Sequence, residues 1–227
     1  MNHHAKPYPC PDCGDQKTGN FCSNCGQHED ERYNLHLLIH EVIHAVTHAD
    51  KGIFSYSIGL LYKPGIIASD FVEGKRKRYF NPFQYLIIIL GLYILTMSAT
   101  HFMEKMTYYM NQNQKSYVKT ELDSAFAIFN KYQKFIYLAL VPLTTFVIQL
   151  LFRKKGFNYT EHLVGYVVYF GNSLFVHSLI ILLSFLPIPF TPLMTLSSII
   201  PIFYMALYFR QFYKVGWIEA ILKSVGY

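Results

Sequence analysis

Charged residues are scarce in this sequence. Lys, Arg, Asp and Glu make up 15% of its 227 residues, whereas soluble domains carry about 25%. A soluble protein of this hydrophobicity would need a large polar shell around its core, and too few polar residues remain to build one. The scarcity therefore excludes an ordinary soluble domain, and a content of 52% hydrophobic and 17% aromatic residues favours a membrane protein.

Charge is missing altogether from four long stretches. These stretches are Phe83–Phe102, Phe135–Phe152, Leu163–Pro187 and Leu193–Phe209. A helix of about 20 residues is about 30 Å long, which matches the hydrocarbon core of a bilayer. The sequence therefore predicts an all-α membrane protein with about four transmembrane helices.

A cleavable signal peptide is also lacking, because the first 30 residues are polar. Basic residues lie before the first predicted span (Lys75–Arg78), between the second and third (Arg153–Lys155), and after the fourth (Arg210 and Lys214). Since basic flanks stay in the cytoplasm, we expect a multi-pass protein of a bacterial inner membrane with both termini cytoplasmic. The net charge of +6 then reflects topology and contact with anionic headgroups, and no separate basic domain suits a nucleic acid.

Cysteine is absent outside one short segment, in which Cys10-x₂-Cys13 and Cys22-x₂-Cys25 form two C-x-x-C motifs, each followed by glycine. Two such motifs bring four thiolates around one tetrahedral ion. The segment therefore predicts a zinc ribbon with one Zn²⁺. Four protein ligands leave no open position, so this ion is expected to be structural. Two disulfides or a rubredoxin-like iron site are the alternatives.

The segment between the ribbon and the first span is predicted to contain short amphipathic helices lying flat on the inner membrane face. Two of them are expected over Gly52–Tyr62 and Ile66–Glu73, followed by a basic collar, Lys75–Arg78. Asn81 and Pro82 suit the N-cap and first turn of the first span. The predicted organisation is a ribbon (1–30), interfacial helices and collar (31–80), a transmembrane domain (81–214) and a cytoplasmic tail (215–227).

Histidine recurs every four residues at His36, His40, His44 and His48, on the polar face of an amphipathic helix. With Glu41, two of these complete an H-E-x-x-H motif, in which a zinc peptidase would use His40 and His44 as ligands and Glu41 as base. A peptidase also needs a third ligand and a substrate cleft, and too little chain precedes the membrane to supply them. The stripe is expected to face water, headgroups or a partner. A non-catalytic metal or proton-sensing site and catalysis stay as alternatives.

Two polar side chains, Asn172 and His177, are expected deep inside the third span. Polar groups at that depth either line a pathway or fasten helices by hydrogen bonds. No acidic residue accompanies them, and the sequence lacks the internal repeat typical of transporters. Fastening is therefore favoured, and a transport pathway remains the alternative.

Glu161 opens the third span, which Thr160 is suited to cap. A carboxylate at the hydrocarbon boundary should reach water or a cation, because desolvating it alone is costly. The collar lies at the same depth, and Arg78 is the favoured partner because a guanidinium binds a carboxylate through two hydrogen bonds. Alternatively the collar binds lipid phosphates. The candidate ion-pair or lipid-contact residues are Lys75, Arg76, Lys77, Arg78, Glu161 and His162.

The order CPDCG, CSNCGQ, DKG, EGKRKRYFNP and YTEHLVGY, from Cys10 to about Tyr213, resembles an uncharacterised family of small bacterial zinc-ribbon integral membrane proteins. The resemblance implies a ribbon and a membrane domain, with no assigned activity. We therefore favour a non-enzymatic interaction or scaffold protein, which contacts membrane lipids at the collar and a protein partner through the ribbon, and which can form oligomers. A subunit of a transport system and an H-E-x-x-H membrane metallopeptidase are the alternatives.

Overall fold

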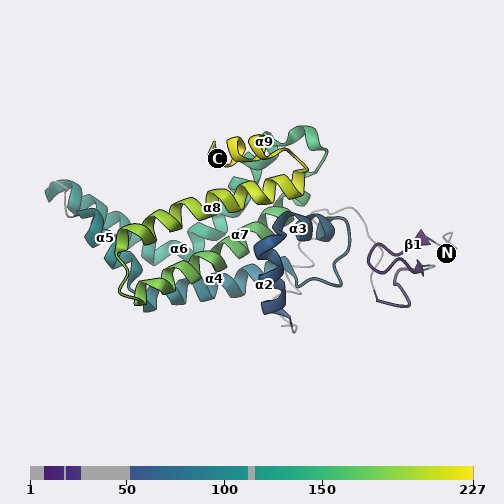
Figure 1. Ribbon diagram of the computed structural model, residues 1–227, viewed down its shortest axis with the longest axis horizontal. Helices are drawn as coiled ribbons and strands as arrows, with labels where there is room; N and C mark the ends of the chain where they lie inside the picture. The colour runs from purple at the N-terminus through teal and green to yellow at the C-terminus, as the bar shows by residue number, and fades with distance from the viewer. Residues whose placement is uncertain (1–7, 18, 27–51, 112–115, 227) are drawn as a thin grey trace.

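The computed structural model describes residues 8–17, 19–26, 52–111 and 116–226, and in these parts of the chain helices dominate (Figure 1). A two-residue strand pair lies at the N-terminal end. The elements are β1 (Tyr8–Pro9), β2 (Gln16–Lys17), α2 (Ile53–Tyr62), α3 (Pro64–Val72), α4 (Pro82–Ala99), α5 (Phe102–Asn111), α6 (Ser116–Leu151), η1 (Arg153–Lys155), α7 (Tyr159–Leu182), η2 (Leu183–Phe185), α8 (Phe190–Tyr213) and α9 (Trp217–Val225).

Four helices are long and apolar enough to cross a membrane. They are Pro82–Ala99, Lys131–Leu151, Tyr159–Phe185 and Phe190–Tyr213. Large apolar side chains such as Leu95, Leu143 and Phe203 stay more than half exposed on them, as is favourable only in contact with lipid. The predicted all-α membrane fold with four spans is confirmed, and these helices indicate a multi-pass membrane protein.

The starts of two spans follow from capping residues. Asn81 accepts hydrogen bonds from the backbone N–H groups of Phe83 (2.9 Å) and Gln84 (3.3 Å), and Pro82 occupies the first turn. The predicted roles of Asn81 as N-cap and Pro82 as a first-turn residue are confirmed. At α7 the cap is Asn158, two residues before Thr160. The prediction of Thr160 was wrong because the helix begins earlier, at a residue whose amide oxygen also caps well.

Helix α7 is the central helix, since it contacts α2, α3, α4, α6 and α8. At the end of the bundle nearest the cysteine ribbon, called the ribbon end below, aromatic rings join the neighbouring helices. Phe152, just after α6, stacks on Tyr213 of α8 with ring centroids 3.8 Å apart. His162 of α7 is fully buried there, with its Nδ1 atom 2.6 Å from the Tyr213 hydroxyl. These contacts hold the ends of three spans together at one level.

Helices α2 and α3 form a bent pair at the ribbon end, and α2 crosses the bundle there (Figure 1). Pro64 opens α3 and separates it from α2. The Gln211 side chain of α8 bonds to the backbone on both sides of the break, donating to Tyr62 O (2.9 Å) and accepting from Gly65 N–H (3.0 Å). Gly65 packs so closely on α8 that a Cβ atom there would lie 2.5 Å from the backbone nitrogen of Phe212.

The segment expected to be a tail contains helix α9, which folds back on the bundle. Ala220 and Ser224 are buried, and Lys223 donates to Leu151 O (3.0 Å) while its ammonium lies 4.1 Å from the centre of the Phe152 ring. The sequence reasoning overlooked α9 because it contains only nine residues and two charges. At the opposite end of the molecule, α5 extends away from the bundle (Figure 1).

Candidate metal centre

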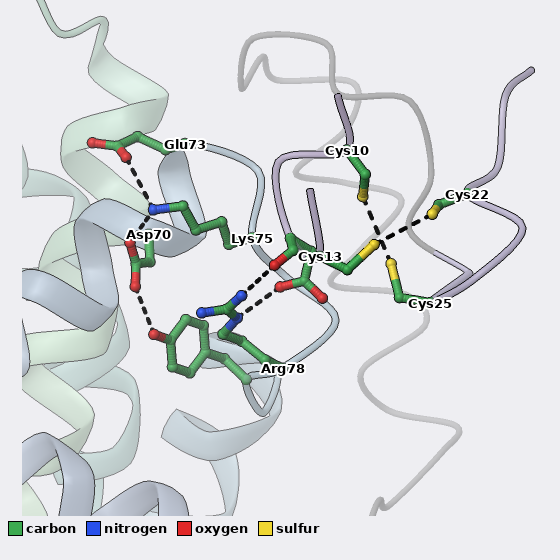
Figure 2. Close-up of polar contacts among 10 residues, drawn as sticks. Cys10, Cys13, Cys22, Cys25, Asp70, Glu73, Lys75 and Arg78 are labelled. Carbon is green, nitrogen blue, oxygen red and sulfur yellow. Dashed lines mark hydrogen bonds and ion pairs between the residues drawn. The ribbon is translucent and has the colours of Figure 1, made fainter. Parts of the chain in front are cut away.

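The four cysteines converge at the N-terminal end of the structure (Figure 2). Their sulfur atoms all lie within 4.8 Å of one another, with Cys10 Sγ 3.7 Å from Cys25 Sγ and Cys13 Sγ 3.6 Å from Cys22 Sγ. Tetrahedral bonds of about 2.3 Å from one ion to four sulfurs require sulfur–sulfur distances of about 3.8 Å. The cysteines are unbridged, so the arrangement fits one metal ion held by four thiolates.

The local backbone explains this convergence. Strands β1 and β2 pair antiparallel, Tyr8 opposite Lys17 and Pro9 opposite Gln16, and thereby close the first loop. In each motif the following glycine adopts a positive φ, 80° at Gly14 and 74° at Gly26, which a residue with a Cβ atom rarely adopts. Each glycine N–H then donates to the carbonyl of the first cysteine of its motif, at 2.9 Å.

Backbone N–H groups also favour the thiolate form of one ligand. Hydrogen bonds from the backbone of Cys25, and then of Asn24, outweigh burial and lower the pKa of the Cys22 thiol to about 7. Thiolates are the metal-binding form of cysteine, so donors aimed at sulfur prepare the site for a cation. The four cysteines could therefore hold a metal ion through sulfur.

The ribbon contacts the membrane domain through the collar (Figure 2). Arg78 Nε donates to Asp12 Oδ1 at 2.7 Å, and Arg78 Nη2 donates to the backbone carbonyl of Asp12. Asp12 lies between the ligands Cys10 and Cys13. The Cε atom of Lys77 lies 3.8 Å from where a Cβ atom on Gly26 would be. Both cysteine motifs therefore border the collar.

The collar is tied to helix α3 by a second set of contacts. Lys75 Nζ lies 2.6 Å from Asp70 Oδ1 and 3.6 Å from Glu73 Oε2. The Tyr79 hydroxyl donates to Asp70 Oδ2 at 2.6 Å. Burial raises the pKa of the Asp70 carboxyl, but the bonds from Lys75 and Tyr79 outweigh it and hold that pKa below its usual value. Burial, with Asp70 beside it, raises the pKa of Tyr79 to about 12.

The remaining predicted collar contacts lie as follows. Arg76 Nε donates to Phe71 O at 3.4 Å. Glu161 is nearly buried and forms a capping box with Asn158: its Oε2 accepts from Asn158 N–H at 2.7 Å, and its own N–H donates to Asn158 Oδ1 at 2.8 Å. Arg78, the favoured partner of Glu161, is paired with Asp12. A contact between the collar and Glu161 stays a prediction.

The intramembrane polar residues form hydrogen bonds between helices. Asn172 donates through Nδ2 to the Tyr204 hydroxyl (2.7 Å) and accepts through Oδ1 from the Tyr85 hydroxyl (2.8 Å). Tyr204 in turn donates to Leu60 O (2.9 Å), and His177 Nε2 lies 2.9 Å from Ser197 O. These hydrogen bonds fit the expectation that the polar residues hold neighbouring helices together, here α2, α4 and α8 against α7. Sequence reasoning missed Tyr85 and Tyr204, because one tyrosine among 19 gives no sign of being buried at a hydrogen bond.

The H-E-x-x-H residues His40, Glu41 and His44 lie outside the described residues, as does the rest of the histidine stripe. Their predicted roles stay predictions.

A family model described as "Protein of unknown function (DUF3667)" matches residues 50–94. The matched segment runs from just before α2 through the collar and most of α4. It therefore contains Asp70, Lys75, Arg78 and Tyr79, and it does not reach the cysteines. No curated protein and no solved structure matches the chain. The match supports a relationship to an uncharacterised family over this segment.

Proposed function

We propose that the protein is a non-enzymatic interaction or scaffold protein of a bacterial inner membrane, whose zinc-loaded ribbon contacts a cytoplasmic protein partner. The observation that carries the proposal is the contact between Asp12 and Arg78, which joins the candidate metal centre to the membrane domain four residues before α4. A ribbon held in this way presents one defined surface to a partner instead of sampling many orientations. Fixing the orientation before binding lowers its entropic cost.

The ligand set supports a structural role for the ion. Zn²⁺ prefers four tetrahedral ligands, and four cysteines fill all of them, so no position remains for a substrate or a water molecule. Iron bound by the same thiolates is the competing metal. Metal analysis of the purified full chain should give one zinc per protein.

Exposed basic side chains support an orientation of the protein in which the ribbon lies on the cytoplasmic side of the membrane. Arg153, Lys154, Lys155, Arg210 and Lys214 are exposed near the ribbon end of the spans. Basic residues at span ends favour the cytoplasmic side and attract anionic headgroups. The ribbon, both chain termini and the collar would then share the cytoplasmic side, where a thiolate metal site is protected from oxidation.

Site-specific photo-cross-linking in native membranes tests the proposal. A photoreactive residue replaces Ser23, which is exposed inside the second cysteine motif, between Cys22 and Cys25. We expect capture of one defined protein, with loss of capture in Cys10→Ser, which breaks the metal site, and weaker capture in Arg78→Gln, which undocks the ribbon. The same probe at Lys105, on α5 at the other end, is the matched control and should not capture that protein. Equal capture with and without Cys10 would refute a ribbon-mediated interaction.

The two alternatives predict different outcomes. A transport subunit requires that solute uptake fall in Asn172→Ala while ribbon-dependent capture persists. A peptidase requires a second metal per chain and loss of a proteolytic product in Glu41→Gln at normal protein levels. The hydrogen bonds that occupy the Asn172 side chain favour the scaffold over the transporter.

A further inference from the structure

A cavity of about 330 Å³, open on one side, is lined by the end of α4, the turn after it, the start of α5 and one residue of α6. The junction of α4 and α5 lies at the end of the bundle opposite the ribbon (Figure 1). Its lining consists of Ile94, Met97, Ser98, His101, Met103, Glu104 and Gln133. The metal centre and the collar do not contribute to it.

The polar and polarisable groups in this lining mainly offer lone pairs. Met97 and Met103 are nearly buried thioethers, 6% and 9% exposed, and His101 and Glu104 add an imidazole and a carboxylate. No Lys or Arg belongs to the lining. The Oε1 atom of Gln133 is buried and has no hydrogen-bond partner among the described residues. A buried acceptor in that state is costly, and a cation or a donor in the cavity would satisfy it.

The imidazole lies beside a carboxylate, and the side chains of His101 and Glu104 are 67% and 77% exposed. His101 Nδ1 lies 3.2 Å from Glu104 Oε1, which leaves Nε2 as the nitrogen available to a ligand. Histidines that bind metals usually donate their other ring N–H to a carboxylate or carbonyl, which fixes the tautomer and the ring orientation. The pair can also be read as a cap of α5, in which Glu104 reaches back one turn.

The backbone of His101 distinguishes these two interpretations. Its φ is 51°, in the left-handed region that glycine adopts far more easily than histidine. A cap alone would be served at least as well by glycine, asparagine or aspartate. Residues held in such conformations concentrate at functional sites. The strained position is therefore better explained by a use for the imidazole itself.

We propose that this cavity binds a copper(I) ion through the His101 imidazole and the Met97 and Met103 thioethers, with Glu104 as the positioning residue. Thioethers are soft ligands that select Cu(I) over the harder divalent cations, and imidazole is a good copper ligand as well. The site lies at the end of α4, whereas the candidate zinc ligands precede its other end. The proposal does not depend on the proposed function of the ribbon.

Methionine-methyl NMR of the full chain tests the site directly. The zinc-loaded protein, ¹³C-labelled at its methionine methyl groups, is titrated in detergent micelles with Cu(I) under anaerobic, reducing conditions. We expect the Met97 and Met103 resonances, assigned by Met97→Leu and Met103→Leu, to shift and to saturate at one equivalent of copper beyond the amount that the cysteines take up. Met205, buried in α8 outside the cavity, is the control and should not move.

The cysteines compete for copper, so released zinc is measured with a chromophoric chelator in the same titration. If zinc is displaced while the Met97 and Met103 resonances stay unchanged at ten equivalents, the proposal is wrong. His101→Gly relieves the left-handed strain and should fold at least as well as the wild type, while its copper affinity falls at least tenfold. Glu104→Gln should weaken binding about 10- to 100-fold. Unchanged affinity in His101→Gly would show that the pair is only a helix cap.

Discussion

The close approach of α3 to α8 at Gly65 can be tested by adding a single methyl group. In Gly65→Ala the new Cβ atom would lie 2.5 Å from Phe212 N, 2.6 Å from Gln211 Cβ and 2.6 Å from Tyr208 O, whereas ordinary contacts are about 3.5–4.0 Å. Two of these atoms belong to the α8 backbone and cannot rotate away. Helix α3 must therefore move off α8 by about 1 Å.

That movement has two energetic consequences. Overpacking of this kind costs about 1–3 kcal/mol, and the hydrogen bonds of Gln211 to Tyr62 O and Gly65 N–H weaken at about 1 kcal/mol each. We expect the α2–α3 pair to lose about 3 kcal/mol of docking free energy, so that its local opening increases about 100-fold.

Hydrogen exchange in detergent measures this opening. The amides of α3, Ile67 to Phe71 for example, should lose about two orders of magnitude of protection in Gly65→Ala, while the amides of α7 keep theirs. Gly91→Ala is the matched control: Gly91 lies in α4 with nothing within 4 Å of an added Cβ, and alanine favours a helix. Full protection of α3 in Gly65→Ala would refute the close packing of the two helices.

Three further substitutions probe the collar and the bundle. Arg78→Lys keeps the charge but loses the two-atom contact with the ribbon, so we expect the docking of the ribbon to weaken by about 1 kcal/mol. Spin-label distances between the ribbon and α4 should then be distributed more broadly than in the wild type. An unchanged distribution would contradict this prediction. The pKa of Asp70 is lowered in the folded protein. Its contribution to collar stability is therefore complete above the usual carboxyl pKa of about 3.9 and is lost as the pH falls through the folded-state pKa. Hydrogen-exchange protection of the collar should drop below about pH 4 in the wild type, and Asp70→Asn should show no such step. Tyr85→Phe leaves Asn172 Oδ1 without this donor and should cost about 1 kcal/mol in unfolding by sodium dodecyl sulfate; a stability equal to the wild type would mean that the bond fastens nothing.

The sequence alone was sufficient to predict the spans, the Asn81 cap and the convergence of the four cysteines. Each depends on residues close together in the chain: an uninterrupted apolar stretch, a cap beside its helix, and two C-x-x-C motifs with a short spacing. Such local patterns determine the structure almost regardless of the rest of the protein. The short helix α2 was predicted to within one residue for the same reason.

Contacts between distant segments were not predictable in this way. Tyr85, Asn172 and Tyr204 meet only because α4, α7 and α8 pack at one particular relative height, and no single helix encodes that height. Glu161 shows a related limit. Its oxygen accepts from Asn158 N–H, and it sits at a helix N-terminus, where the macrodipole favours negative charge. These groups stabilise the carboxylate at the hydrocarbon boundary in addition to any water or cation that reaches it.

The candidate metal ligands and the docking contact with Arg78 lie in one short piece of chain, so metal binding at the cysteines would affect docking, and docking would affect metal binding. Asp12 lies between Cys10 and Cys13, so its carboxylate and carbonyl are placed for Arg78 only while the first cysteine motif keeps its folded shape. By linkage, docking strengthens metal binding by the same factor as the metal strengthens docking. A half-exposed contact of about 1 kcal/mol limits the factor due to Arg78 to about five. Thiolate zinc sites bind far more tightly than that factor can offset. The ribbon would therefore keep its metal when it leaves the collar, and a partner that competes for Arg78 would change the position of the ribbon without emptying it.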